Sequence, residues 1–145
     1  MRSYFEYQHF VTFADTNLVG NVYFANYLAW QGACRERFLA ERAPSVASRL
    51  TTDLVLVTLS CSCEFFSEVY ALDRVSVRMS LAGTTGSTIA MRFGYYRVNR
   101  GPAQLVARGG QEVACMTRRD GELIPIEIPG ELASALASYA VAGTG

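Results

Sequence analysis

The pattern of apolar and polar positions predicts a chain made mostly of strands, with one long helix near its start. Residues 4–13 are rich in aromatic and β-branched types, which is typical of a strand. After a polar connection at residues 45–53, strand patterns continue to about Ile128. The predicted strands span residues 54–69, 74–81, 88–98, 105–117 and 123–128. A short helical segment at residues 131–139 and a frayed Gly-Thr-Gly tail are expected to follow.

After the first strand, apolar residues recur at helical spacing from about Val22 to about Arg42. One face of this predicted helix carries Tyr23, Tyr27, Cys34 and Phe38. We expect Asn21 to cap its start, and Pro44 to end it because proline disfavours helical geometry in the preceding residue. One sheet must then cover one long helix, so we predict an α+β fold in which an antiparallel β-sheet wraps around a central α-helix. No linker or repeat divides the sequence, and residues 1–145 are expected to form a single domain.

The amino-acid composition and net charge exclude several classes of function. Apolar and aromatic residues make up 50% of the chain and charged residues 18%, which leaves room for a buried subunit interface or a lipophilic cavity. The formal net charge is zero without a basic block, so nucleic acid and membrane surfaces are not indicated as partners. No apolar run reaches the ~20 residues that span a bilayer. All 13 cationic residues are arginine, and the absence of lysine excludes Schiff-base chemistry.

The four cysteines suit neither a disulfide framework nor a metal site. Cys61 and Cys63 are two positions apart on one face of a predicted strand, which matches neither a CxxC motif nor a bridge between them. The N-terminus already reads as a strand, so we expect no signal peptide. Reduced thiols in a cytoplasmic protein, without metal or cofactor, are the resulting expectation.

The turn and helix start carry a motif that resembles a known enzyme family. Residues 15–28 read D-T-N-L-V-G-N-V-Y-F-A-N-Y-L and resemble the hotdog-fold thioesterases of the 4-hydroxybenzoyl-CoA thioesterase type. A longer match is similar to the thioesterases of enediyne polyketide pathways; it comprises T-F-A-D-T-N-L-V-G-N-V-Y-F-A-N-Y-L-A-W-Q-G-A-C-R-E and, later, S-C-S-C-E-F-F-S-E. The resemblance implies one hotdog domain over residues 1–145. It also implies a homo-oligomer, a dimer or a dimer of dimers, with active sites at subunit interfaces.

For the activity, the resemblance implies hydrolysis of a long polyene acyl chain, carried as a β-keto thioester, from the acyl carrier protein of an iterative polyketide synthase. The sequence departs from the broad family at two positions. Asn17 stands where many members have a catalytic aspartate, and Phe24 stands where a histidine is often found. An amide accepts no proton from water at neutral pH, so Asn17 is not a general base. By match to the enediyne group, the site residues are Asn17, Tyr27 and Arg35.

Each of these residues could have a purely structural role instead of a functional one. Asn17 would hold the attacking water or the substrate carbonyl, or would simply favour the turn. Arg35 would stabilise an oxyanion or an enolate-like β-keto thioester, or would be a solvated helix arginine. Tyr27 would donate a hydrogen bond to substrate, or would only pack. Free backbone N–H groups at the predicted helix start would form an oxyanion site, and they belong to Val22, Tyr23 and Phe24.

Other residues compete for the role of base or nucleophile. The candidate carboxylates are Glu36, Glu64 and Glu68. Glu64 is the best of them, because it is set in an otherwise apolar strand where a buried carboxyl would suit a base. His9 lies in the first strand, away from the motif, and Cys34 has no evident base beside it.

The sequence is compatible with three alternative functions. A general acyl-CoA thioesterase would favour a basic rim for the CoA phosphates, and the sequence shows no basic cluster. A hotdog dehydratase needs a catalytic histidine paired with a carboxylate, for which His9 is badly placed. A non-catalytic acyl-binding hotdog protein would explain the missing aspartate at position 17.

Overall fold

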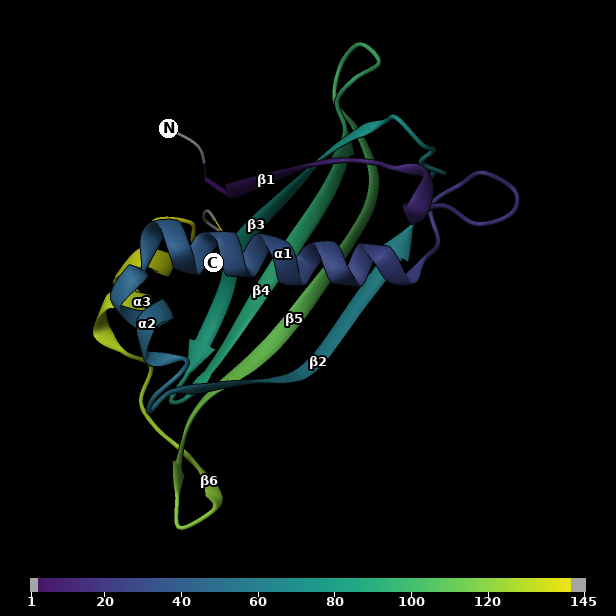
Figure 1. Cartoon of the computed structure of the whole chain (residues 1–145). Coiled ribbons are helices and arrows are strands. Elements are labelled where there is room, and N and C mark those ends of the chain that lie inside the picture. Colours follow the sequence, from purple (N-terminus) through teal and green to yellow (C-terminus); the bar gives the residue numbers. More distant parts are fainter. Residues whose placement is uncertain (1–2, 142–145) are drawn as a thin grey trace.

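Within residues 3–141, which the computed structural model describes, six strands form one antiparallel sheet that curves around a long helix (Figure 1). The strands are β1 (Phe5–Phe10), β2 (Val55–Phe65), β3 (Arg74–Thr85), β4 (Thr88–Arg97), β5 (Gln104–Arg119) and β6 (Glu122–Pro125). Their spatial order is β1-β3-β4-β5-β2, and β6 pairs with β5 beyond this path. The predicted α+β architecture is therefore confirmed.

Four helical segments complete the described chain. They are the 3₁₀ helix η1 (Phe13–Asp15) and the α-helices α1 (Ala25–Arg42), α2 (Pro44–Arg49) and α3 (Gly130–Ala137). Helix α1 ends at Arg42, as predicted, and Pro44 then opens α2, because proline fits the first turn of a helix. Helix α2 lies in the segment that was predicted to be a polar connection. In the described residues, no helix is long and apolar enough to cross a membrane.

The start of α1 differs from the prediction. The helix begins at Ala25 with Phe24 at its N-cap, so the predicted capping role of Asn21 is wrong. The preceding residues are held extended, because the N–H of Val22 donates to the carbonyl of Val69 at 2.8 Å and that of Tyr23 donates to Asp15 at 2.9 Å. Hydrogen bonds to Val69 and to Asp15 thus keep Val22 and Tyr23 out of the helix.

Helix α1 packs one face into the curved sheet. Its buried residues are Tyr27, Trp30, Gln31, Cys34, Phe38 and Leu39. The apolar members of this face each contribute about 1.5–3 kcal/mol by leaving water. Tyr23, predicted on the same face, precedes the helix and is 48% exposed. Gln31 is fully buried in the middle of the stripe, a position that needs hydrogen-bond partners.

The strand predictions are confirmed with shifted ends. The predicted strand 54–69 stops at Phe65, and the chain then crosses to β3 through the buried Val69. Asp120 and Gly121 form the predicted hairpin turn between β5 and β6, with φ of +50° and +82°. The Gly-Thr-Gly tail, predicted to be frayed, lies outside the described residues.

Candidate active site

The loop before α1 is organised by Asp15. Its Oδ2 accepts hydrogen bonds from the backbone N–H of Thr12 at 2.9 Å and from the Thr12 hydroxyl at 3.2 Å. Its backbone carbonyl accepts bonds from the Tyr23 N–H and from Asn26 Nδ2, at 2.9 and 2.8 Å. Asp15 therefore ties η1 to the residues that lead into α1.

Asp15 also fixes His9. The His9 Nε2 lies 2.9 Å from Asp15 Oδ2, and its Nδ1 lies 3.0 Å from the Tyr7 hydroxyl. The imidazole stacks against Trp30 with 4.5 Å between ring centroids. His9 was predicted to lie away from the motif, but β1 brings it into direct contact with the motif. Its polar atoms are satisfied, as expected of a structural histidine.

The pKa of Asp15 is set by opposing effects. Partial burial would raise it, but the hydrogen bonds from His9 and Thr12 outweigh burial and hold the pKa below the ordinary value for an aspartate. Since the folded state lowers this pKa, the carboxylate stabilises the fold above the ordinary carboxyl range. That contribution disappears as the pH falls through and below this range.

We expect Asp15→Ala to reduce the free energy of unfolding by about 2–3 kcal/mol at neutral pH, because several hydrogen bonds to a charged carboxylate are lost. Urea unfolding of both proteins at pH 7 and at about pH 3 tests this, and the difference between them should shrink at the acid pH. Glu41→Ala, which removes an exposed i,i+4 pair with Arg37, is the control and should change stability by less than about 0.5 kcal/mol. A pH-independent difference for Asp15→Ala would contradict the electrostatic account.

Asn17 is exposed at the tip of the same loop. Its Oδ1 accepts the N–H of Val19 at 3.0 Å, and its backbone groups bond to Asn21 and Gly20. Gly20 takes a φ of +92°, which closes the turn. Asn17 is thus a turn residue, and its Nδ2 makes no hydrogen bond to any residue between 3 and 141. This amide N–H₂ remains available to donate to a ligand.

Arg35 lies near the middle of α1 and reaches toward β2 and β5. Its Nη1 donates to Thr58 Oγ1 at 3.1 Å and to Gln111 Oε1 at 3.0 Å, while its buried Nε has no partner in the described part of the chain. Burial lowers the pKa of Arg35, although nearby Glu36 opposes this, and the guanidinium remains charged. Among the described residues, no carboxylate forms an ion pair with it. A half-buried cation without an anionic partner is costly, and it favours the arrival of a negatively charged group.

A β-bulge lies beside Arg35. The pairing of β2 with β5 shifts register between Thr58 and Ser60, where one extra residue is accommodated. Such bulges re-aim neighbouring side chains. Here the shift occurs at the threonine whose hydroxyl bonds to the guanidinium.

Tyr27 is a packed aromatic. It is 3% exposed, and its ring lies 4.9 Å from Phe65, 5.2 Å from Trp30 and 5.4 Å from Tyr95, centroid to centroid. Burial is the main cause that raises the pKa of Tyr27 to about 12; Glu68 adds a smaller increase, and Arg97 opposes it. Its hydroxyl stays protonated and has no hydrogen-bond partner within residues 3–141, so it keeps a proton to donate.

Two of the three backbone donors predicted for an oxyanion site are occupied. The N–H groups of Val22 and Tyr23 donate to carbonyls of the chain, so they are not free as the prediction requires. Phe24, which is 59% exposed at the N-cap of α1, donates its N–H to no group in the described residues and remains a candidate.

The structure gives no support to the competing bases and nucleophile. Glu64 was predicted to be buried, but its side chain is 66% exposed and pairs with Arg108 at 3.1 Å. Strand alternation explains this, because the preceding Cys63 faces the core side of β2. Glu68 bonds to the Tyr70 hydroxyl and, at 3.3 Å, to Asn21 Nδ2, and Glu36 is exposed on α1.

Cys34 is buried, and burial raises the pKa of its thiol to about 12, which keeps it protonated and non-nucleophilic. Within the described residues, no group of three or more His, Cys, Asp or Glu could hold a metal ion.

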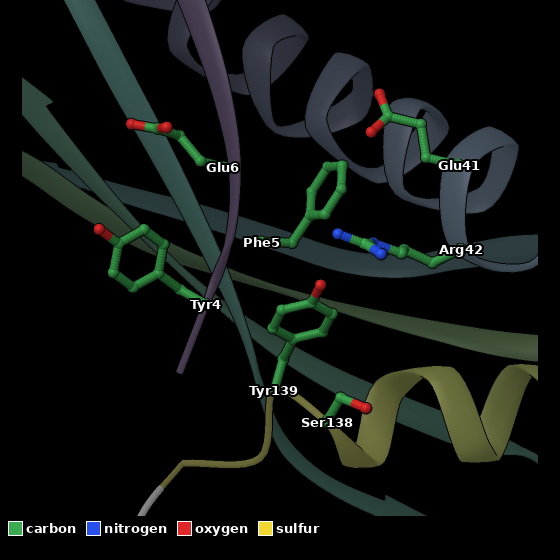
Figure 2. A pocket seen from close by; sticks show the side chains of 7 residues that line it. All are labelled: Tyr4, Phe5, Glu6, Glu41, Arg42, Ser138 and Tyr139. Carbon is green, nitrogen blue, oxygen red and sulfur yellow. The ribbon is translucent and has the colours of Figure 1, made fainter. Parts of the chain in front are cut away.

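Asn17, Tyr27 and Arg35 do not meet within one subunit. In the described residues they make no hydrogen bond or ring contact with one another, and Arg35 is ten residues, or about 15 Å, along α1 from Ala25. A hollow of about 540 Å³ lies at the C-terminal end of α1 and is lined by none of them (Figure 2). There Phe5 and Tyr139 approach the helix end that carries Glu41 and Arg42.

Arg35 borders two smaller spaces. One is an open hollow of about 290 Å³, lined by Arg35, Glu36, Leu39, Leu50, Leu54, Val55 and Leu56. The other is a narrow apolar crevice between α1, α3 and the sheet, lined by Arg35, Phe38, Leu39, Leu56, Ile89, Met91, Val113, Leu132 and Leu136. The guanidinium thus borders apolar side chains in both spaces, and the crevice itself encloses only about 10 Å³.

Residues 11–136, which are most of the chain, match the family model of the Thioesterase-like superfamily. The chain belongs to the thioesterase-like superfamily. It is a hotdog-fold thioester hydrolase, as the motif at residues 15–28 predicts.

Solved structures agree with this assignment. The dynemicin thioesterase, whose crystal structures revealed induced-fit and allosteric effects upon polyene binding, is 52% identical and has a TM-score of 0.94, with 97% of this chain and 99% of that one covered. The 1,4-dihydroxy-2-naphthoyl-CoA thioesterase of Synechocystis shares the fold at 23% identity and a TM-score of 0.81, over 92% and 96% of the two chains. The 4-hydroxybenzoyl-CoA thioesterase of Pseudomonas sp. shares it at 19% identity and a TM-score of 0.80, over 91% and 98%. No curated protein matches this thioesterase.

Proposed function

We propose that this thioesterase hydrolyses a long polyene β-keto acyl chain from the acyl carrier protein of an iterative polyketide synthase. The observation that carries the proposal is Arg35, a half-buried cation that has no carboxylate partner among residues 3–141 and lies at the edge of a narrow apolar crevice. A β-keto thioester brings a polar head, on which negative charge develops, and an apolar tail. Polyene binding by the dynemicin thioesterase supports the choice of chain.

In the proposed reaction, the oxygen of water attacks the thioester carbonyl carbon and the C–S bond then breaks. The thiol of the carrier's prosthetic arm leaves with a proton, and the β-keto acid is released. Negative charge develops on the carbonyl oxygen during attack, and a fixed guanidinium stabilises it without taking a proton. The attacking water loses one proton as the C–O bond forms, and the leaving thiolate takes up one proton, so that the products are the acid and the thiol.

Asn17 acts through its Nδ2 in this scheme. Its Oδ1 already accepts the Val19 N–H, so the N–H₂ group is the part of the amide that faces a ligand. It donates to the substrate carbonyl, together with the N–H of Phe24 at the positive end of α1. The Tyr27 hydroxyl supplies a further donor.

The active site is completed between two subunits. The loop that carries Asn17 exposes Phe13, Leu18, Val19, Tyr23 and Phe24. The long strand β2 lies at the free edge of the sheet, where an unpaired ladder favours pairing with another chain. A homodimer, or a dimer of dimers, would cover these surfaces and bring Asn17 of one subunit toward Arg35 of the other.

All four cysteines are free, which fits a reducing compartment such as the cytoplasm.

The test compares turnover of one polyene β-keto acyl group on an acyl carrier protein and on CoA. We expect kcat/KM to be at least about tenfold higher for the carrier-bound substrate, because the carrier adds binding contacts. Equal or better turnover of the CoA thioester would instead indicate a general acyl-CoA thioesterase.

Asn17 variants test the donor in the same assay. Both Asn17→Ala and Asn17→Asp should lower kcat by about 100-fold, the usual cost of losing one oxyanion donor. The aspartate variant can still accept the Val19 N–H, so it preserves the turn and isolates the loss of the donor. Activity of Asn17→Asp at or above the wild-type level would show that the amide N–H₂ is not what the reaction uses.

A further inference from the structure

A chain of amide side chains runs beneath α1 and ends on Arg35. Gln111 on β5 accepts a hydrogen bond from Arg35 Nη1 at 3.0 Å, and its Nε2 donates to Gln31 Oε1 at 3.1 Å. Gln31 on α1 in turn donates from its Nε2 to the backbone carbonyl of Ser62 at 2.9 Å. Gln31 is fully buried and Gln111 is 6% exposed, so the chain is shielded from water.

The direction of every bond in this chain is fixed from its far end. The Ser62 carbonyl can only accept, so the N–H₂ group of Gln31 must face it and the oxygen of Gln31 must face Gln111. The N–H₂ group of Gln111 must therefore face Gln31, which leaves its oxygen toward the guanidinium. A flip of either amide would bury two donors or two acceptors against each other, at a cost of about 1–3 kcal/mol.

The backbone makes room for this arrangement at Gly109. A Cβ at this position would lie 2.1 Å from the Ser62 carbonyl oxygen and 2.6 Å from Gln31 Nε2. Only a residue without a side chain allows Gln31 and the Ser62 carbonyl to meet here.

From this geometry we infer that Gln111, oriented by Gln31, is a positioning residue that aims Arg35 at the substrate while leaving its charge unneutralised. A carboxylate at position 111 would hold the guanidinium as firmly, but it would supply the negative charge that the developing oxyanion should supply. A neutral amide oxygen fixes the direction of Nη1 and leaves the cation free for substrate. This inference rests on the proposed role of Arg35.

The experiment measures kcat, KM and thermal stability of Gln111→Glu, with the same polyene β-keto thioester as substrate. We expect kcat to fall by about 100-fold, as for the loss of one oxyanion contact, with KM changed by less than about threefold. The protein should still be folded at the assay temperature, because the new ion pair with Arg35 offsets part of the cost of facing a carboxylate oxygen toward Gln31 Oε1. A purely structural role would lower stability and activity together. Gln111→Asn, which keeps a neutral amide on a shorter arm, should retain more activity than Gln111→Glu.

Gln104→Glu is the matched control. Gln104 also lies on β5 and also accepts a hydrogen bond from an arginine, Arg97, but on the exposed side of the sheet. The same charge change there should leave kcat unaltered.

Arg35→Ala in the same assay distinguishes a failure of the Gln111 positioning role from a failure of the proposed function. If Arg35→Ala is inactive and Gln111→Glu is fully active, the positioning role is wrong and the proposed function stands. If Arg35→Ala itself is fully active, both the role of Arg35 and the positioning of it are wrong.

Discussion

Replacing Arg35 with alanine should lower kcat for the β-keto thioester by about 100- to 1,000-fold, the range found when an oxyanion loses a fixed donor. The guanidinium is the cation that borders the apolar crevice beneath α1 without a carboxylate partner in the described residues. Its removal also deletes a half-buried charge with an unsatisfied Nε, so stability should not fall by the usual cost of a lost ion pair. Steady-state kinetics and thermal unfolding of the same preparations give both quantities.

Two further variants sharpen the Arg35 prediction. Arg37→Ala removes an arginine two positions away that is 62% exposed and pairs with Glu41, and it should leave kcat within about twofold. Arg35→Lys keeps the charge but loses the planar fork, so it should recover only part of the activity. A loss of activity that is equal in Arg35→Ala and Arg37→Ala would point to a damaged helix instead of a missing oxyanion partner.

The sequence predicts the architecture well because its strongest patterns are local. The helical stripe of Tyr27, Cys34 and Phe38 is buried as expected. The hairpin turn also lies at Asp120-Gly121, as the turn preference of this dipeptide predicts. The start of α1 was placed too early for a reason that is not local. The N–H of Val22 is taken by the carbonyl of Val69, which is distant in the sequence and adjacent only in the fold.

Contacts between residues distant in the sequence also explain why several predictions about the candidate site were wrong or incomplete. Glu64 looked buried because its neighbours in β2 are apolar, yet Phe65 and Phe66 are themselves about half exposed and Glu64 faces Arg108. The contact between Arg35 and Gln111 joins residues 76 positions apart, and no spacing rule predicts it. Asp15 and His9 were likewise not seen as partners, because β1 must first be placed beside the loop.

Some of the missed residues did leave a signal in the sequence. Gln31 lies between Tyr27 and Cys34 at helical spacing, so a polar side chain stands inside an apolar stripe. Gly109 and Gly110 interrupt a strand pattern, which often marks the close approach of another group. Taken together, an amide on the helix face and a glycine pair in the facing strand indicate a polar contact across the core.

Gly109 affects both the stability of the fold and the position of Arg35 in the candidate site. It pairs with Cys63 in the β2–β5 ladder, and an added Cβ would press on backbone, the Ser62 carbonyl, which cannot rotate aside as a flexible side chain would. Relief requires β5 to move away from β2 or Gln31 to leave the Ser62 carbonyl. Either shift also disturbs Gln111 and so Arg35.

We therefore expect Gly109→Ala to reduce the free energy of unfolding by about 3 kcal/mol, the upper range for overpacking a core, and to lower the thermal midpoint by roughly 10 °C. Gly83→Ala on β3 is the matched control, because a Cβ there meets nothing within 4 Å and the glycine is likewise in a strand. Urea and thermal unfolding of the three proteins measure the stability, and kcat of the folded Gly109→Ala protein measures the site. Since the amide chain loses its anchor at Ser62, that kcat should fall even at temperatures well below the lowered midpoint. A destabilised Gly109→Ala protein with the full kcat would mean that Arg35 is held well enough by Thr58 alone.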